Sequence, residues 1–388
     1  MLFQNLSIPG KPGFYDISTE NDLILRIAAT GELPNETVGI RVDFRNAIAF
    51  PGLINSHDHL DFNLFPRFGN KRFNNYLDWG HHLHENFKQE IHQIMQVPQT
   101  LRTSWGIYKN LINGFTTVVN HGDPLVITTS PILVIQENNI LHSVGFEKNW
   151  IWKLNNPLAR KYPFVVHIGE GTDKKAESEI NQLIHWNLLK RKLVGVHGVA
   201  MNANQAAKFE ALIWCPESNF FMLGKTADIR SIIKNTRILF GTDSTLTAGW
   251  NAWEHFRRAR IISKVNDNEL FDMLTLNAAN TWNLRHAGTL QPAMKANIVI
   301  ARTRNSQSWD SFYAINPVDI LLVIQEGKIR LFDCDLEAAL GSRIETLPDE
   351  YSKIRIGNSE KFVWGDLPGL INKIRDHHPK FESGWETA

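Results

Sequence analysis

Cysteine, long apolar runs and an excess of charge are all missing from this sequence. Only Cys215 and Cys334 occur among its 388 residues, which is too few for a disulfide framework. The first residues lack the basic and apolar regions of a secretory signal. No run approaches the roughly 18 apolar residues that span a bilayer. These absences predict a cytoplasmic protein without a membrane partner.

Charge is nearly balanced, with 41 Lys and Arg against 40 Asp and Glu and a formal net charge of +1. This balance provides no global attraction to a nucleic acid or an anionic membrane, so we expect neither as a partner. Hydrophobic residues make up 43% of the chain and charged residues 21%, values typical of a globular protein with a substantial core. A chain of this length can form one large barrel with a small satellite domain.

Both ends of the chain are rich in short, strand-like runs bounded by turn residues. Such runs lie near the N-terminus and return towards the C-terminus, at 22–27, 38–43, 297–301, 320–325 and 329–332. We therefore expect residues 1–50 and 290–340 to build one small β-sandwich domain together. The polar remainder, 341–388, is expected to form a C-terminal tail or cap.

Residues 51–289 alternate short apolar runs with helical stretches such as 174–190, where apolar residues recur at helical spacing. This alternation is typical of a parallel barrel or a doubly wound sheet, and we expect an α/β fold with a (β/α)8 TIM-like barrel. One of the eight strands is either abbreviated in the short gap between 146 and 164 or lacks a recognisable pattern. The other seven strands are predicted at 52–56, 116–120, 140–146, 164–168, 193–196, 211–215 and 238–242.

The strongest local signal is the segment PGLINSHDHLDF at 51–62, in which an apolar strand ends at His57 and His59. Residues i and i+2 of a strand point to the same face, so both imidazoles project into one space. Two neutral imidazoles on one side are good ligands for Zn²⁺ or Fe²⁺. Such a pair is often incidental when it stands alone, so a metal site requires further ligands.

Other predicted strands end in residues of the same kind. His167 ends one strand and is followed three residues later by Glu170, while His197 and Asp243 end two others. In a parallel barrel the carboxyl ends of all strands meet at one rim, where active sites lie. These residues are therefore expected to meet the paired histidines at a single site.

The motifs and their order resemble the amidohydrolase superfamily, in particular its ATZ/TRZ (chlorohydrolase) and nucleobase-deaminase-like branch. The resemblance rests on the paired histidines, the later H-x-x-E, the next strand-end histidine, GTDS, and the segments WCPESNFFML and LNAAN. It covers about residues 40–330. The sequence departs from the family pattern at Ala293 and at 296–298, and the stretch before His167 is compressed.

The resemblance implies one divalent metal, zinc or alternatively iron, held by His57, His59, His167 and Asp243. Such a metal lowers the pKa of bound water so that hydroxide is available at neutral pH. Asp243 would also accept a proton from that water, and His197 would orient the water and stabilise charge on the attacked oxygen. Glu170 would protonate a ring nitrogen or the leaving group.

The resemblance also implies an enzyme that acts on carbon–nitrogen bonds other than peptide bonds. The H-x-x-E feature favours a hydrolytic deaminase of an aminated heterocycle, of purine, pyrimidine, triazine or pterin type. The alternative is a cyclic-amide (ring C–N) hydrolase, such as an imidazolonepropionase- or dihydroorotase-like enzyme, and a more remote one is a non-catalytic barrel used for binding. The expected partner is a small heterocyclic substrate, and a homo-oligomer stays open because family members often assemble.

A binuclear site would need a bridging lysine or glutamate. Glu147 and Lys148, which follow a predicted strand, are the obvious candidates, and we favour solvated loop residues for both. His121 also follows a strand, and its place is left open between the surroundings of the metal and a loop. A polar helix is expected to carry three solvated histidines, His81, His82 and His84.

Overall fold

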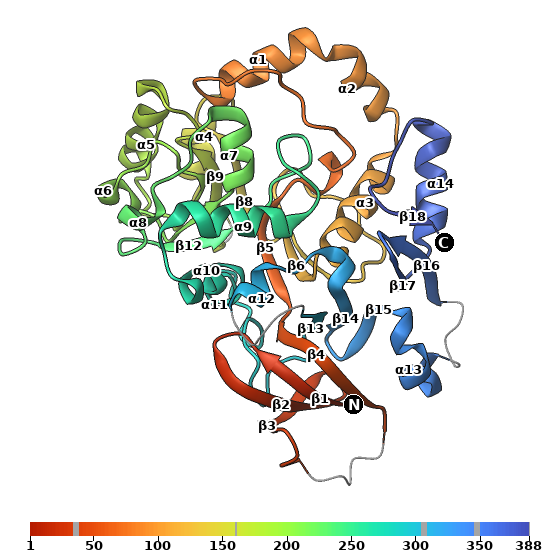
Figure 1. The fold of residues 1–388 in the computed structure, drawn as a ribbon. Coiled ribbons are helices and arrows are strands. Elements are labelled where there is room, and N and C mark those ends of the chain that lie inside the picture. The colour runs from red at the N-terminus through yellow and green to blue at the C-terminus, as the bar shows by residue number, and fades with distance from the viewer. Residues whose placement is uncertain (34–38, 160, 304–308, 345–349, 388) are drawn as a thin grey trace.

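A computed structural model describes residues 1–33, 39–159, 161–303, 309–344 and 350–387 of the chain. It combines a barrel of parallel strands with a long sheet that lies beside it (Figure 1). The red N-terminal strands lie at the bottom of the view, and the blue strands that follow the barrel extend from there up its right side (Figure 1). The chain therefore begins in the sheet, builds the barrel and returns to the sheet.

Eight strands of the described chain follow one another around the barrel in sequence order. They are hydrogen-bonded as two parallel groups, β5-β6-β7 and β8-β9-β10-β11-β12. The two groups meet where the backbone amide of Asp243 donates to the carbonyl oxygen of His57 at 3.1 Å. This arrangement confirms the predicted TIM-like barrel. The strands are β5 (Leu53–Asp58), β6 (Phe115–Asn120), β7 (Leu133–Ile135), β8 (Asn139–Ser143), β9 (Phe164–Ile168), β10 (Leu193–His197), β11 (Ala211–Trp214) and β12 (Arg237–Phe240).

The strand that the sequence did not reveal is β7, which contains only Leu133–Ile135. Three residues are too few to show the alternation that marks a strand. The gap between 146 and 164, where an abbreviated strand was one expectation, instead contains the short helix α4 (Trp150–Leu154). The other seven predicted strands agree with the structure to within a few residues at their ends.

Helices cover the outside of the barrel and join its strands (Figure 1). The longest is α3 (Gln99–Ile112), whose buried face packs on the barrel. The other barrel helices are α1 (Tyr76–Asn86), α2 (Lys88–Met95), α5 (Lys174–Trp186), α6 (Ala203–Ala206), α7 (Pro216–Leu223), α8 (Ile229–Ile232), α9 (Ala252–Ser263), α10 (Asp267–Leu274) and α11 (Leu276–Thr281). Three helices follow strands of the long sheet, and α13 packs on that sheet through Leu340: α12 (Trp309–Tyr313), α13 (Glu337–Ile344) and α14 (Leu367–His377).

Close approach of β5 and β12 requires a glycine at position 241. A Cβ atom at Gly241 would lie 2.7 Å from the Cβ of His57 and 2.9 Å from the Sγ of Cys215. No real side chain tolerates such contacts, so the glycine of the GTDS motif lets these strand ends pack together. The site described below depends on this contact because His57 and Asp243 lie on these two segments.

Both chain ends contribute to one ten-stranded sheet of the described residues, in the order β18-β16-β17-β15-β14-β13-β4-β1-β2-β3. The two ends meet where β4 and β13 pair antiparallel, with Phe50 opposite Val299. A description of this sheet as a small β-sandwich stays a prediction. The strands are β1 (Leu2–Ile8), β2 (Lys11–Glu20), β3 (Leu23–Ala29), β4 (Arg41–Pro51), β13 (Ile298–Arg302), β14 (Ile320–Gln325), β15 (Lys328–Asp333), β16 (Tyr351–Ile356), β17 (Ser359–Trp364) and β18 (Glu386–Thr387). Residue 38, where one predicted strand begins, lies outside the described residues.

The C-terminal segment is attached to both the sheet and the barrel. Strand β17 pairs antiparallel with β15. The hydroxyl of Tyr108 on α3 donates to the carbonyl oxygen of Trp364 at 3.0 Å. The ring of Trp105, also on α3, stacks on Trp385 at 4.5 Å. The domain limits of 1–50 with 290–340, 51–289 and 341–388 stay predictions.

Among the helices of the described chain, none combines the length and the apolar character required to cross a bilayer.

Candidate metal centre

Two imidazoles project from the carboxyl end of β5 towards one carboxylate. The Nε2 atoms of His57 and His59 each lie 4.0 Å from Oδ1 of Asp243. The His57 side chain is fully buried, and the His59 side chain is 14% exposed. The strand places both rings on one face, and the closure between β5 and β12 brings the carboxylate to them.

His167, at the end of β9, is the third imidazole of this group. Its Nδ1 lies 2.8 Å from the carbonyl oxygen of His142, and its Nε2 lies 3.3 Å from Nε2 of His57. A carbonyl only accepts, so Nδ1 carries the proton and Nε2 keeps its lone pair. This is the tautomer that a metal ligand needs, with the other ring nitrogen held by a backbone carbonyl.

Asp243 is held in a left-handed backbone conformation, with φ of 57°. Its Oδ1 accepts from the backbone amide of Ser244 at 2.7 Å, and its Oδ2 accepts from the hydroxyls of Ser218 at 2.7 Å and Thr247 at 3.0 Å. Burial acts to raise the pKa of this carboxyl. The charges of His59 and His197 and these hydrogen bonds outweigh burial and lower the pKa below its ordinary value. The carboxylate is therefore ionised and fixed.

A chain of hydrogen bonds sets the tautomer of His197. The indole of Trp214, which can only donate, lies 2.6 Å from Oγ1 of Thr226, and that hydroxyl donates to Oδ1 of Asn219 at 3.1 Å. The amide nitrogen of Asn219 must then face Nδ1 of His197, which lies 2.9 Å away. His197 consequently accepts at Nδ1 and carries its proton at Nε2, 3.4 Å from Oε1 of Glu170. Because a metal ligand atom cannot carry a proton, this tautomer favours a role for His197 other than that of a ligand.

Glu170 and His197 are both buried, at 5% and 1% exposure. Burial raises the pKa of the Glu170 carboxyl well above its ordinary value, and the charges of Asp243 and Glu179 raise it further. Burial lowers the pKa of His197 to about 4. A neutral imidazole that faces a carboxyl with a raised pKa provides a proton donor beside the metal candidates.

The residues present suit a divalent cation. Two sets of three potential ligand atoms each lie within 4.8 Å of one another among the described residues. Burial lowers the pKa of His57 and His167 well below the ordinary histidine value, so both are neutral. Neutral imidazoles combined with one ionised carboxylate form a donor set that fits a zinc ion. The two sets are His57, His59 and His167, and His57, His197 and Asp243.

Sequence reasoning left the place of His121 open, and the structure puts it against the site. His121 is 3% exposed, and its ring centroid lies 4.3 Å from that of His167 and 5.0 Å from that of His57. Neither of its ring nitrogens has a hydrogen-bond partner among the described residues. His121 therefore belongs to the surroundings of the candidate ligands.

The bridging candidates lie apart from both ligand sets. Glu147 forms an ion pair with Lys153 at 2.8 Å, and Lys148 is exposed. Neither joins a group of potential ligands among the described residues. On α1, His81 and His84 are exposed as expected, while His82 is partly buried.

The candidate ligands open onto a cavity of about 110 Å³. Flat aromatic rings form much of its wall, and Glu170 and His197 face it from the polar side. No Lys or Arg is among the described residues that line it. The aromatic wall consists of Phe62, Tyr76, Trp79 and Phe146.

Sequence reasoning named the strand-end residues but missed the side chains that orient them. Ser218 and Asn219 lie in the segment WCPESNFFML, whose polar pair was the available signal. Thr247 follows GTDS by three residues, and nothing local marks it. Lys109, which lies on α3 below the site, carried no signal in the sequence.

Residues 155–330 match the family model described as the amidohydrolase family. No curated protein matches the chain. Among solved structures, the chain is similar to an adenosine deaminase from Xanthomonas campestris with bound zinc, at 15% identity, with 98% of each chain covered and a TM-score of 0.72. It is also similar to atrazine chlorohydrolase TrzN from Arthrobacter aurescens complexed with zinc, at 15% identity over 89% of this chain and 99% of that one, with a TM-score of 0.67. A 5-methylcytosine deaminase from Klebsiella pneumoniae is 15% identical over 85% of this chain and 97% of that one, with a TM-score of 0.62.

The family match includes β9, β10 and β12, whose carboxyl ends carry His167, Glu170, His197 and Asp243. The solved structures share the fold of this chain from end to end or nearly so. Together these findings confirm the resemblance to amidohydrolases. They also confirm the prediction of a metal-dependent hydrolytic enzyme of that type.

Proposed function

We propose that this protein is a hydrolytic deaminase of an aminated heterocycle. The observation that carries the proposal is the pair formed by Glu170 and His197, 3.4 Å apart, at the edge of a cavity walled by aromatic rings. A carboxyl with a raised pKa can donate a proton to a ring nitrogen, and flat side chains stack on flat rings. Two of the similar solved structures are described as deaminases.

In this proposal His57, His59, His167 and Asp243 hold one divalent metal. Zinc is the first candidate because two of the similar structures contain it, and iron is the alternative. When bound, the metal lowers the pKa of a water molecule and stabilises developing negative charge. A binuclear site is disfavoured because Glu147 is paired with Lys153.

The side chains of the chain itself then move the protons. The ionised carboxylate of Asp243 accepts a proton from the attacking water. Glu170 delivers a proton to the ring nitrogen beside the attacked carbon, and His197, through Nε2–H, stabilises charge on the attacking oxygen. Asp243 then returns its proton to the exocyclic amine, the carbon–nitrogen bond breaks, and Glu170 recovers a proton from the new hydroxyl group. The products are ammonia and the keto form of the ring, without any change in oxidation state.

The chemistry of the cavity separates this function from the cyclic-amide alternative. Substrates of the imidazolonepropionase or dihydroorotase kind carry a carboxylate, which a binding site usually meets with a cation. The described lining residues contain no Lys or Arg. Nearby Arg67 and Arg258 both pair with Glu217, at 3.7 and 2.6 Å. An uncharged ring of purine, pyrimidine, triazine or pterin type fits this lining better.

Ammonia release tests the proposal. Protein loaded with Zn²⁺ or with Fe²⁺ is offered aminated purines, pyrimidines, triazines and pterins, and ammonia is measured. Glu170→Gln should lower the rate by about 10²- to 10⁴-fold, the usual contribution of a positioned acid, and leave one metal per chain. Ring-opened product without ammonia would instead establish the cyclic-amide alternative. A small-molecule partner, a homo-oligomer and a cytoplasmic location stay predictions.

A further inference from the structure

Asp58, the residue between the two candidate histidine ligands, points away from the cavity. Side chains alternate along a strand, so a residue between two site histidines faces the opposite side. Asp58 is fully buried there, and its Oδ2 lies 3.0 Å from Nζ of Lys109, whose side chain is 3% exposed. A buried ion pair therefore lies directly beneath the candidate metal centre.

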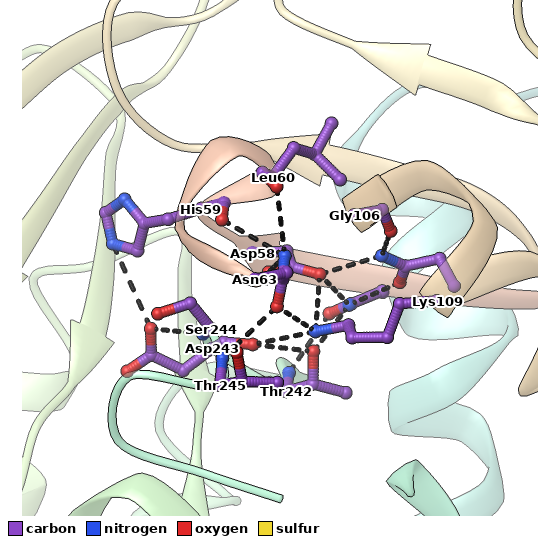
Figure 2. Close-up of polar contacts among 12 residues, drawn as sticks. Asp58, His59, Leu60, Asn63, Gly106, Lys109, Thr242, Asp243, Ser244 and Thr245 are labelled. Atoms are coloured by element: carbon purple, nitrogen blue, oxygen red, sulfur yellow. Dashed lines mark hydrogen bonds and ion pairs between the residues drawn. The ribbon is translucent and has the colours of Figure 1, made fainter. Parts of the chain in front are cut away.

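Every polar atom of this pair has a partner, as Figure 2 shows. Oδ1 of Asp58 accepts from Asn63 at 2.9 Å, and Oδ2 accepts from Asn110 at 2.7 Å. Nζ of Lys109 donates to Oδ1 of Asn63 at 2.7 Å and to the backbone carbonyl of Asp243 at 3.3 Å. The three N–H groups of the ammonium thus have partners in β5, in the turn after β5 and in the segment after β12.

Lys109 consequently contacts both halves of the candidate ligand set. Through Asp58 it holds the backbone between His57 and His59, and directly it holds the carbonyl of Asp243. That carbonyl belongs to a residue with φ of 57°, a backbone conformation that is uncommon for residues with a side chain and costs free energy. Asn55 supports the same junction, since its amide nitrogen donates to Oγ1 of Thr242 at 2.7 Å.

We propose that Lys109 and Asp58 form a positioning pair that sets the distance between the paired histidines and Asp243 for metal binding. This inference rests on the proposed metal site. A buried ion pair is weak evidence for a stabilising role, because an apolar pair of similar size often does as well. Groups that hydrogen-bond to metal ligands, in contrast, commonly alter metal affinity by about 10- to 100-fold.

The chain contains a matched control in the sheet. Lys361 and Asp333 also form a buried pair at 3.0 Å, with side chains 0% and 4% exposed. Nζ of Lys361 donates to the carbonyl oxygens of Val318 and Ile320, at 3.0 and 2.6 Å. This pair joins β17 to β15, to the first residue of β14 and to the segment before β14, none of which carries a candidate ligand.

The test compares metal affinity with stability in four variants. Zn²⁺ affinity is measured by competition with a chromophoric chelator, and unfolding of the metal-free protein is measured in urea. Lys109→Met should reduce both, because it leaves Asp58 charged and buried. Adding Asp58→Asn should restore stability, while Zn²⁺ affinity stays about 10- to 100-fold weaker than in the unsubstituted protein. Lys361→Met, with and without Asp333→Asn, should change stability and leave Zn²⁺ affinity unaltered.

The visible spectrum of the Co²⁺-loaded protein supplies a second reading of ligand geometry. The spectrum should change in the barrel double variant, which combines Lys109→Met with Asp58→Asn. It should stay constant in the sheet double variant, which combines Lys361→Met with Asp333→Asn. If Lys109→Met does not fold, Asp58→Asn alone should still weaken Zn²⁺ affinity. Zn²⁺ affinity that recovers together with stability in the barrel double variant would overturn the positioning role alone. Absence of Zn²⁺ affinity in the unsubstituted protein would overturn the proposed metal site as well.

Discussion

The rim of the barrel and the ten-stranded sheet both contain residues with left-handed backbone, but only those at the rim are candidate site residues. In the sheet, Asn5 and Asn46 have φ of 62° and 56° and lie where the β1–β4 register shifts. Asparagine, like aspartate and histidine, tolerates this conformation better than most residues, and Asn5 is held further by hydrogen bonds with Asp16 and Asp43. At the rim the residues are His197 and Asp243, with φ of 72° and 57°. Residues from other parts of the chain hydrogen-bond to both of them.

The comparison between the rim and the sheet shows where contacts between distant segments hold the backbone. At the bulge in the sheet, the exposed Asn46 has a residue type that suits its backbone conformation. At the rim, the residue types are those that the proposed chemistry needs, and other segments hold them in place. Asn219 hydrogen-bonds to His197, and Lys109 hydrogen-bonds to the carbonyl oxygen of Asp243. Backbone strain at the rim is thus supported by a buried polar network, which is the usual situation at functional sites.

Among the substitutions that test this comparison, the largest effect is expected when the hydrogen bond that supports His197 is changed. Asn219→Asp replaces an amide donor with a carboxylate that can only accept from Nδ1. The proton should move to Nδ1, so that Nε2 no longer donates towards Glu170. We expect kcat/KM for ammonia release to fall by about 10- to 100-fold. Metal content of about one per chain should be retained, and a normal rate in this variant would show that the tautomer does not matter.

A smaller effect concerns the carboxyl of Glu179 behind the rim. Burial raises its pKa from 4.5 to about 7, and the Tyr76 hydroxyl lies 3.2 Å away. Between these pH values the native protein binds more protons than the unfolded chain, so stability falls as pH rises through this window. Glu179→Gln should remove this dependence and stabilise the protein at pH 8 by on the order of 2 kcal/mol. The free energy of unfolding in urea, measured at pH 5 and at pH 8 for both proteins, gives this difference in stability.

The sheet should show the opposite dependence on pH. Burial acts to raise the pKa of Asp333, but the charge of Lys361 together with hydrogen bonds from Ser359, the Asp335 backbone and Lys361 outweighs burial and lowers the pKa below 3.8. This carboxylate therefore stabilises the native protein above that pH, and the stabilisation is lost only on further acidification.

The Glu179 prediction has a clear contradicting outcome. If the stability of the Glu179→Gln protein still falls between pH 5 and pH 8, another group titrates in that range.

The smallest effect is expected in the bulge of the sheet. Asn46 is exposed, and glycine adopts its backbone conformation without strain. Asn46→Gly should alter the free energy of unfolding by less than about 0.5 kcal/mol. Asn46→Val should cost on the order of 1–2 kcal/mol, because a β-branched residue resists left-handed backbone. Equal effects of the two substitutions would show that contacts of the side chain matter more than its φ.

Much of the barrel could be predicted because its strands are apolar runs of four to six residues that end in polar side chains. The exception, β7, has three residues and therefore no period to recognise. The proximity of His57, His59, His167 and Asp243 followed from the rule that parallel strand ends share one rim. The supporting side chains could not be predicted, since Thr226, Asn219 and Lys109 have no local pattern that indicates their partners.

By itself, the sequence determined the alternation of strands and helices and the kinds of residue at the strand ends. It did so because burial and the two-residue period of a strand act over neighbouring positions. Only the tertiary structure decided which nitrogen of His197 carries the proton and which cation holds Asp243 in place. The reason is distance along the chain: Lys109 meets the carbonyl of Asp243 across 134 positions. Such contacts exist only after the barrel has closed between β12 and β5.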